Sequence, residues 1–330
     1  MTILICGGAG YIGSHMTRWL RSRGIRATVL DNLSTGHREA IGDCRLIQAD
    51  LLDPAALDAA FASESFDAVM HFCARSLVGE SVAKPLEYYE NNVTGTLNLL
   101  QAMRRHHVEK LVFSSTAAVF GRPVTERIDE SHPTAPINPY GASKLMVEHI
   151  LKDAAQAYGL RSVALRYFNA AGASEDASIG ESHEPETHLI PNVIAAVSDV
   201  DGRRLQIFGD DWPTPDGTCI RDYVHVDDLA QAHWHALAYM DRHEGAHTFN
   251  LGNGCGFSVK EVVQAVERIS KRKVPYDIAP RRSGDPAVLV AASDRACAEL
   301  GWRPTHTNLD DIIASAWQWH RGPGFGPRHD

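Results

Sequence analysis

The sequence predicts an α/β fold with a parallel, doubly wound sheet and a smaller α/β domain beside it. The first observation is that apolar runs of strand length alternate with stretches of helical periodicity over the first half of the chain. The second is a glycine-rich stretch, residues 7–13, directly after the first apolar run. The third is that polar side chains follow several of these runs. Parallel strands connected by helices produce this architecture, with the polar residues gathered at one sheet edge.

The elements of the first half follow from the same signals. Strands are expected at residues 3–6, 26–31, 46–51, 66–73, 110–115 and 162–168. Helices are expected between them, at residues 14–24, 53–61, 87–107 and 141–159. Gly95 is the only interruption expected in the third helix. Residues 121–139 are rich in proline and polar side chains, so they are expected to form a loop.

The second half is expected to complete the large sheet and to build the smaller domain. Residues 1–176 are predicted to form the first domain, with returning segments near 220–253, and residues 177–330 mainly the second. Strands are expected at residues 205–208 and 247–251, the latter returning to the large sheet. The expected helices start near His188 and Asp227, and two more cover residues 258–270, capped by Ser258, and 309–320.

Composition and charge exclude several classes of function. The chain has 330 residues, of which 44% are hydrophobic and 22% charged, as is ordinary for a globular protein. A net charge of −9 argues against a nucleic-acid partner, because such proteins carry a basic face. No apolar run is long enough to cross a membrane, and the chain starts with a strand rather than a secretory signal.

Cysteine and histidine usage points to a reduced compartment and to no metal. The cysteines are scattered and none forms a C-x-x-C pair, so we expect a cytoplasmic protein without a disulfide framework. The densest histidine groups are His106 with His107 and His233 with His235. Neither has the spacing of a zinc site, and we therefore expect no metal site.

The glycine-rich stretch lies in the context of a dinucleotide-binding site. It follows a strand, precedes a helix, and is followed by a second strand that ends in Asp31. Its glycines let the backbone approach a pyrophosphate, which binds at the helix N-terminus. A carboxylate at Asp31 accepts hydrogen bonds from both ribose hydroxyls and repels a 2′-phosphate. The sequence therefore predicts a Rossmann-type domain that binds NAD rather than NADP.

Tyr140 and Lys144 lie four residues apart at the start of an expected helix, so their side chains point the same way. A nearby ammonium favours the phenolate and lowers the pKa of a tyrosine, which is otherwise near 10. Taken alone, the pair also fits an interfacial tyrosine and an exposed lysine on an amphipathic helix. The cofactor loop and the residues Ser114 and Thr116 at a strand end favour a catalytic pair.

These motifs together resemble the extended short-chain dehydrogenase/reductase family, and within it the UDP-glucose 4-epimerases (also called UDP-galactose 4-epimerases). The G-x-x-G-x-x-G loop, the Y-x-x-x-K pair and the strand-end Ser-Ser-Thr are family-wide. More specific stretches lie at residues 31–33, 78–81, 91–96, 166–169, 216–226 and 280–286. The resemblance extends from residue 3 to about residue 320.

The resemblance implies reversible epimerisation at C4 of UDP-galactose and UDP-glucose, through a transient 4-keto sugar and tightly bound NAD. Tyr140 would be the base, Lys144 would hold the nicotinamide ribose and lower the Tyr140 pKa, and Thr116 would hydrogen-bond the sugar 4-oxygen. The implied NAD-binding positions are Gly7, Gly10, Tyr11, Ile12, Gly13, Asp31, Asn32, Asp50, Leu51, Phe72, Cys73, Ser76, Asn92, Ser114, Tyr140, Lys144 and Phe168. The implied UDP-sugar positions are Thr116, Asn169, His188, Leu189, Gln206, Phe208, Arg221, Arg282, Asp285 and Leu289.

The chain departs from the pattern of some epimerases at three of these positions. Ser76 replaces a lysine after the fourth strand, and His188 replaces an asparagine of the uracil pocket. Leu289 replaces a bulky tyrosine beside the sugar C2. A smaller side chain leaves more room there, and the resulting hypothesis is activity on UDP-N-acetylhexosamines.

Three alternative functions are compatible with the same fold. They are those of another NAD-dependent nucleotide-sugar epimerase, a 4,6-dehydratase and a non-catalytic NAD-sensing regulator. A dehydratase needs an Asp-Glu pair after the strand-end threonine, where this chain has Ala117 and Ala118. A regulator has no need of Tyr140, Lys144 and Thr116 together. We also expect a homodimer, because in related enzymes the helices matching residues 87–107 and 141–159 pair across a two-fold axis.

Overall fold

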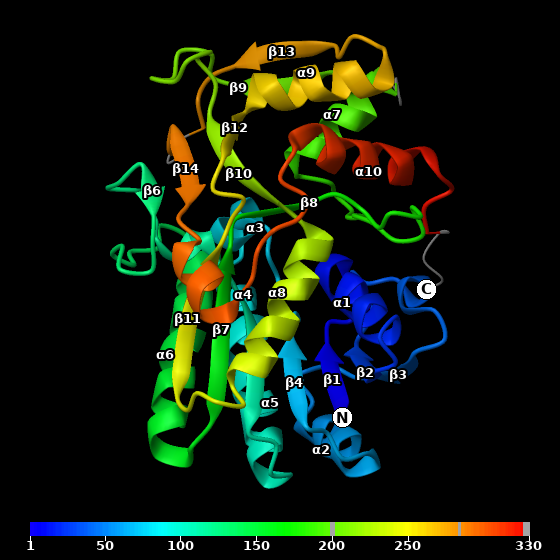
Figure 1. The fold of residues 1–330 in the computed structure, drawn as a ribbon, viewed down its shortest axis with the longest axis vertical. Helices are drawn as coiled ribbons and strands as arrows, with labels where there is room; N and C mark the ends of the chain where they lie inside the picture. The colour runs from blue at the N-terminus through cyan, green and yellow to red at the C-terminus, as the bar shows by residue number, and fades with distance from the viewer. Residues whose placement is uncertain (199–201, 283–284, 326–330) are drawn as a thin grey trace.

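The larger layer of the molecule is a parallel sheet with the strand order β11-β7-β5-β4-β1-β2-β3 (Figure 1). The computed structural model describes residues 1–198, 202–282 and 285–325. The strands of this sheet are β1 (Thr2–Cys6), β2 (Arg26–Asp31), β3 (Arg45–Gln48), β4 (Ala68–His71), β5 (Lys110–Thr116), β7 (Arg161–Tyr167) and β11 (Ala246–Leu251). The strand order reverses direction at β1, as in a Rossmann-type fold. The predicted doubly wound parallel sheet is confirmed.

Helices cover both faces of this sheet, and the alternation of side chains along β1 shows why. Ile3 and Ile5 belong to the apolar core shared with α1 (Tyr11–Arg21) and α8 (Val226–Tyr239). Leu4 and Cys6 point to the opposite core, and the helices there are α2 (Pro54–Ser63), α5 (Gly95–Arg105) and α6 (Pro139–Tyr158). Both faces of a parallel strand are buried, and each large aliphatic side chain contributes about 1.5–3 kcal/mol to stability.

A smaller part lies beyond the carboxyl ends of the large sheet (Figure 1). Its strands are β6 (Arg127–Ile128), β8 (Asn169–Ala171), β9 (Leu205–Phe208), β10 (Ile220–His225), β12 (Gly256–Ser258), β13 (Tyr276–Ala279) and β14 (Val288–Ala291). Its helices are α7 (Leu189–Val197), α9 (Val259–Ser270) and α10 (Leu309–Arg321). These helices share one apolar core. The predicted Ser258 cap is confirmed, since Ser258 and Glu261 form a reciprocal capping box at the start of α9.

Helix α6 is held at both ends by residues suited to those positions. The Asn138 side chain accepts a hydrogen bond from the backbone N–H of Gly141 at 2.8 Å, and Pro139 is the first helical residue. Gly159 ends the helix in the left-handed conformation, with a φ of 72°. A cap of this kind contributes about 1 kcal/mol. The start of α6 is therefore fixed one residue before Tyr140.

Three parts of the chain differ from the sequence prediction. Residues 87–107 are not one α-helix: α4 (Pro85–Tyr89) continues through a π-helical turn (Glu90–Thr94) into α5. The wider turn coincides with Asn92, which is 2% exposed and bonded to a neighbouring loop. The predicted loop 121–139 contains β6, and β8 follows β7 directly; both pair with distant strands that no local pattern indicates.

The remaining short elements connect these layers. They are α3 (Val78–Ala83), the 3₁₀ turns Arg38–Ile41 and Ala117–Val119, and the π-helical turn Ala296–Leu300. In the part of the chain that the structure describes, we find no helix with the length and apolar character needed to span a bilayer. The stretch 280–286, which carries part of the resemblance, includes Ser283 and Gly284, and these two lie outside the described residues.

Strand β11 reaches the large sheet after the chain has passed through the smaller part. It pairs in parallel with β7, from Ala246 opposite Ser162 to Leu251 opposite Tyr167. The predicted return of residues 247–251 to the large sheet is confirmed. This strand forms one edge of the sheet, next to the strand whose end leads into β8.

Candidate active site

The glycine loop between β1 and α1 is folded so tightly that two of its residues have no room for a side chain. Gly7 has a φ of +79°, and a Cβ atom there would lie 2.7 Å from the backbone nitrogen of Cys73. A Cβ atom on Gly13 would lie 2.1 Å from the carbonyl oxygen of Gly7. Glycine alone tolerates both conditions. The loop thereby places the N-terminus of α1 beside the end of β4.

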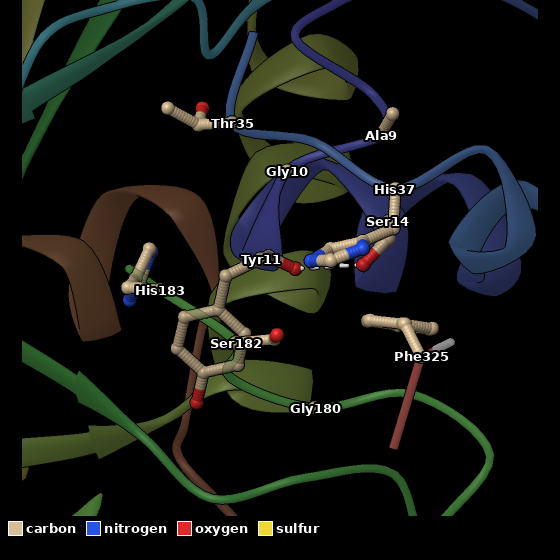
Figure 2. A pocket seen from close by; sticks show the side chains of 10 residues that line it. All are labelled: Ala9, Gly10, Tyr11, Ser14, Thr35, His37, Gly180, Ser182, His183 and Phe325. Atoms are coloured by element: carbon tan, nitrogen blue, oxygen red, sulfur yellow. Dashed lines mark hydrogen bonds between the residues drawn. The ribbon is translucent and has the colours of Figure 1, made fainter. Parts of the chain in front are cut away.

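A small cavity opens at this helix start (Figure 2). It is lined by Ala9, Gly10, Tyr11, Ser14, Thr35, His37, Gly180, Ser182, His183 and Phe325. Figure 2 shows His183 on one side of Tyr11 and Phe325 on the other. Gly10 is the N-cap of α1 and has no side chain to occupy the first N–H groups. The N-terminus of α1 therefore presents free N–H groups, which favour an anion such as the pyrophosphate of a dinucleotide.

Asp31 ends β2 and is 6% exposed. Its carboxylate accepts hydrogen bonds from the backbone N–H groups of Ala9 at 2.9 Å and Leu33 at 2.8 Å. Burial raises the pKa of Asp31 above its usual value, although both backbone hydrogen bonds oppose that change. Beside it, the Asn32 amide donates to Asp50 at 2.7 Å. These carboxylates and the loop provide the donors and acceptors that the adenosine half of NAD requires.

The predicted catalytic residues meet where β5 ends and α6 begins. Lys144 is 2% exposed, and its Nζ donates to the carbonyl oxygen of Ser114 at 2.7 Å. Burial lowers the pKa of Lys144 to about 7, while the nearby Glu148 raises it. Burial raises the pKa of Tyr140, and a hydrogen bond with the Thr116 side chain opposes this. Tyr140, Lys144 and Thr116 therefore form one group.

The expected lowering of the Tyr140 pKa is not found in the protein without bound cofactor. Lys144 was expected to lower the pKa of Tyr140, yet the pKa of Tyr140 lies above its usual value. The reason is that burial disfavours the phenolate, and the Lys144 ammonium is directed at the Ser114 carbonyl instead. Burial also disfavours the charged form of Lys144, which weakens its effect on neighbours.

The other predicted cofactor residues line the same sheet edge. Asn92 accepts a hydrogen bond from the backbone N–H of Arg75 at 2.9 Å and donates to the Ser143 hydroxyl at 3.0 Å. This joins the loop after β4, which carries Ser76, to α6. The Ser114 hydroxyl shares a short hydrogen bond with the Tyr167 hydroxyl. Tyr11 and Ile12 begin α1, Leu51 follows β3, Phe72 and Cys73 follow β4, and Phe168 separates β7 from β8.

The structure brings several predicted substrate residues together in the smaller part. The Arg282 guanidinium lies 3.8 Å from the centre of the Phe208 ring. Arg221 lies 3.9 Å from Asp285 and is paired in register with Leu289 across β10 and β14. An arginine guanidinium suits the forked recognition of a diphosphate.

The remaining predicted substrate positions are spread around this group. The Asn169 amide donates to the carbonyl oxygen of Asp222 at 2.8 Å, and Leu189 begins α7. Gln206 is exposed and contacts Asp277 at 3.4 Å. Their contact with a substrate stays a prediction.

His188 lies in an arrangement that the sequence reasoning missed. Its ring contacts Glu181 and Glu186, and His183 contacts the same two carboxylates. Burial alone lowers the pKa of both histidines, but the two nearby glutamate carboxylates outweigh it and raise the values to about 9 for His183 and about 10 for His188. The E-x-H-x-x-E-x-H spacing of residues 181–188 is the feature of the sequence that indicates this cluster.

Comparison with known proteins defines the class of this chain. A family model described as the NAD dependent epimerase/dehydratase family matches residues 3–252. The chain belongs to this family.

Within this family, the chain is similar to several UDP-glucose 4-epimerases. The chain is 51% identical over 321 residues to a UDP-glucose 4-epimerase of Halalkalibacterium halodurans, covering 97% of this chain and 96% of that one. The crystal structure of UDP-glucose 4-epimerase from Brucella ovis in complex with NAD has a TM-score of 0.93 and 46% identity, covering 96% and 97% of the two chains. The UDP-Glc/GlcNAc 4-epimerase of Campylobacter jejuni has a TM-score of 0.85 and 44% identity, covering 97% and 99%.

Proposed function

We propose that this chain is an NAD-dependent isomerase that interconverts UDP-galactose and UDP-glucose by inversion at C4. The observation that carries the proposal is the grouping of Tyr140, Lys144 and Thr116 at the strand ends, next to the glycine loop. A relative that is 51% identical to this chain is a UDP-glucose 4-epimerase. The structurally similar UDP-glucose 4-epimerase from Brucella ovis was crystallised in complex with NAD. The residues of the loop and of the β2 end fit that cofactor.

The proposed roles of the residues follow from their positions. NAD, when bound, supplies the acceptor that takes the C4 hydride and gives it back. Tyr140 removes the proton of the sugar 4-hydroxyl and returns it after inversion. Thr116, already in contact with Tyr140, holds the 4-oxygen and aligns the proton path. Lys144 orients the cofactor ribose and contributes positive charge from a buried position.

The assay for this function needs only the purified protein and one substrate. Incubation with UDP-galactose, without added reductant, is expected to produce UDP-glucose, and the reverse reaction is expected to reach the same final ratio. Chromatographic separation of the two sugars measures both directions. Formation of a dehydrated sugar instead would support a 4,6-dehydratase, which lacks its acid/base pair here because Ala117 and Ala118 follow Thr116. No product from either sugar would reject the proposal.

A second substrate class is supported by Leu289, which replaces a bulky residue beside the expected sugar C2. Leu289 is partly buried and packs against the apolar cluster that contains Phe168. A neighbour at 44% identity is a UDP-Glc/GlcNAc 4-epimerase. We therefore propose activity on UDP-N-acetylhexosamines as well. Incubation of the purified protein with UDP-GlcNAc tests this, and absence of turnover at high enzyme concentration would exclude it.

Two adjacent arginines provide a matched pair of variants for the UDP site. Arg282 stacks on Phe208, whereas Arg281 pairs with Asp211 and lies over Trp212. We expect Arg282→Ala to raise KM by roughly 10- to 100-fold with a smaller effect on kcat, since charge-assisted hydrogen bonds contribute about 1.5–3 kcal/mol. Arg281→Ala is the control and should leave KM nearly unchanged. Steady-state kinetics separates the outcomes, and equal KM values for the two variants would place the diphosphate elsewhere.

We also propose a homodimer formed through the helices around α4, α5 and α6. Large apolar side chains are exposed there, including Leu86 at 79%, Leu97 at 37% and Met146 at 45%. Exposed apolar side chains gathered on neighbouring helices are typical of an association surface. Light scattering of the purified protein measures the mass directly, and a monomer at micromolar concentration would contradict the proposal.

A cytoplasmic location is the remaining part of the proposal. The six cysteines are all free, and three of them are buried. Unpaired buried thiols suit a reducing compartment. Cell fractionation tests this, and recovery of the protein outside the cytoplasm would refute it.

A further inference from the structure

The loop before α7 carries four side chains that converge on one point. They are Glu181, His183, Glu186 and His188, and their potential ligand atoms all lie within 4.8 Å of one another. His188 Nδ1 lies 2.7 Å from a Glu181 oxygen and 3.1 Å from a Glu186 oxygen. His183 Nδ1 lies 3.2 Å and 3.7 Å from oxygens of the same two residues. Two imidazole nitrogens and two carboxylates therefore surround a common centre.

Four of these separations are close to those between the ligand atoms of a four-coordinate metal ion. Zinc binds nitrogen and oxygen ligands at about 2.0–2.2 Å, which places neighbouring ligand atoms of a tetrahedron about 3.3 Å apart. The four nitrogen-to-oxygen separations range from 2.7 to 3.7 Å. They lie on both sides of the tetrahedral value, so small side-chain rotations would complete the coordination.

Contacts with the surrounding structure position Glu181, His183 and Glu186. Glu181 is 5% exposed, and its carbonyl oxygen accepts a hydrogen bond from the Trp319 indole at 2.8 Å. One Glu186 oxygen accepts from the backbone N–H groups of Thr187 and His188, both at 2.8 Å. The His183 ring meets the Tyr11 ring edge to face, with 6.2 Å between centroids. Hydrogen bonds that orient a ligating carboxylate, as those to Glu186 do, are characteristic of metal sites.

The hydrogen bonding of His183 is incomplete, which is a second and independent indication of a ligand at this point. The Nδ1 atom of His183 is buried, and it has no hydrogen-bond partner with acceptable geometry in the described structure. A buried polar atom of this kind is unfavourable unless something binds it. The two carboxylates also need two compensating positive charges, which either two imidazolium rings or one divalent cation can supply.

We propose that Glu181, His183, Glu186 and His188 bind one divalent transition-metal ion, with zinc as the best match to two imidazoles and two carboxylates. Four protein ligands leave no open position, so the site is structural rather than catalytic. The ion would fix the loop that connects the glycine-loop cavity, through His183, to the start of α7 and to Trp319 of α10. The earlier expectation of no metal considered only His106, His107, His233 and His235.

The first experiment measures metal retention in the full chain. Protein carrying no histidine tag is stripped with a chelator, mixed with one equivalent of zinc, desalted and analysed by mass spectrometry. About one ion per chain is expected for a closed site. Zinc should also raise the unfolding temperature, because it binds the folded state in preference. Stripped protein that retains no zinc would overturn the proposal in favour of a metal-free ion-pair cluster.

Variants locate the ion. His183→Ala with His188→Ala should abolish retention and the zinc-dependent rise in unfolding temperature, and Glu186→Gln should weaken both with less risk to folding. His306→Ala is the matched control, because that histidine pairs with Asp228 outside the cluster at 3.2 Å. Zinc retention by the double-histidine variant at the wild-type level would overturn the assignment.

Cobalt reports the geometry independently of activity. Replacing zinc by Co²⁺ in the wild-type protein should give the intense visible absorption of a tetrahedral ion, and Glu186→Gln should change that spectrum. The weak absorption of six-coordinate cobalt would contradict the closed four-ligand site. Because the readouts are metal content and spectrum, they are independent of whether the chain epimerises UDP-sugars.

Discussion

Tyr140→Phe is expected to lower kcat by roughly 10²- to 10⁴-fold while leaving the fold and the NAD content intact, as for loss of a positioned acid–base group. The ring keeps its place at the start of α6, so only the hydroxyl that contacts Thr116 is lost. KM should change little, because the proton transfer occurs in the transition state rather than on binding. Progress curves with UDP-galactose, together with the cofactor absorbance of the purified variant, measure both quantities.

A matched control for this variant lies on the same helix. Tyr158 is the last residue of α6 and is 59% exposed. Tyr158→Phe should retain the wild-type kcat. A near-normal kcat for Tyr140→Phe would remove Tyr140 as the base and would require another residue at the β5 end to carry the proton.

Glu148→Ala is expected to destabilise the protein by about 3–5 kcal/mol, because it leaves a buried guanidinium without a partner. The side chains of Glu148 and Arg166 are each 8% exposed, and two of their atoms lie 2.5 Å apart. Glu148 also accepts a hydrogen bond from the Ser115 hydroxyl at 2.6 Å. The pair joins α6 to β5 and β7 directly behind Lys144. Urea unfolding measures the change in free energy.

Two further variants test whether the buried charge causes the loss of stability in Glu148→Ala. Asp277 pairs with Arg204 by two hydrogen bonds at 2.8 Å, but both side chains are about half exposed (48% and 53%). Asp277→Ala should therefore cost less than about 1 kcal/mol. The double change Glu148→Ala with Arg166→Met should be less destabilising than Glu148→Ala alone, since no charge is left buried. If the single and double variants lose the same free energy of unfolding, the loss of packing rather than the buried charge causes the destabilisation.

Loss of Glu148 should also affect Lys144. Burial lowers the pKa of Lys144 to about 7, and Glu148 counteracts part of that change. Without this carboxylate, the ammonium is neutralised at a lower pH than in the wild-type protein. We therefore expect the stability of the protein and the activity of this site to depend on the same ion pair.

Much of the large sheet could be predicted because its signals are local. Most strands from β1 to β7 in that sheet are short apolar runs, and every connection except the one between β2 and β3 carries helical periodicity. The glycine loop, Asp31 and Thr116 could be placed at strand ends for the same reason. The α6 boundaries followed from Pro139 and Gly159, whose backbone preferences are strong.

What escaped prediction depends on contacts between distant segments. The two residues of β6 pair with β14, from Arg127 opposite Val290 to Ile128 opposite Ala291, and no periodicity exists in two residues. The π-helical turn contains Asn92, whose side chain forms hydrogen bonds with Arg75 and Ser143, and these residues are distant in the sequence. The raised pKa of Tyr140 depends on burial, which the spacing of Tyr140 and Lys144 does not reveal.

The histidine and glutamate cluster escaped for a different reason. Its four residues lie within eight positions of sequence, so their proximity needed no long-range contact to suggest it. They lie in a polar stretch before α7 that shows neither helical nor strand periodicity. Only the backbone path from Gly180, packed against Trp319, turns their side chains toward a common centre.

The late position of β11 has a consequence for synthesis of the chain. Strand β7 ends at Tyr167, but its outer neighbour begins only at Ala246. While the intervening residues are being made on the ribosome, the backbone N–H and C=O groups along that side of β7 have no partner strand. An open strand edge is a site where two chains can associate wrongly. A nascent chain stopped near residue 176 is therefore expected to aggregate, and release beyond Leu251 should restore solubility.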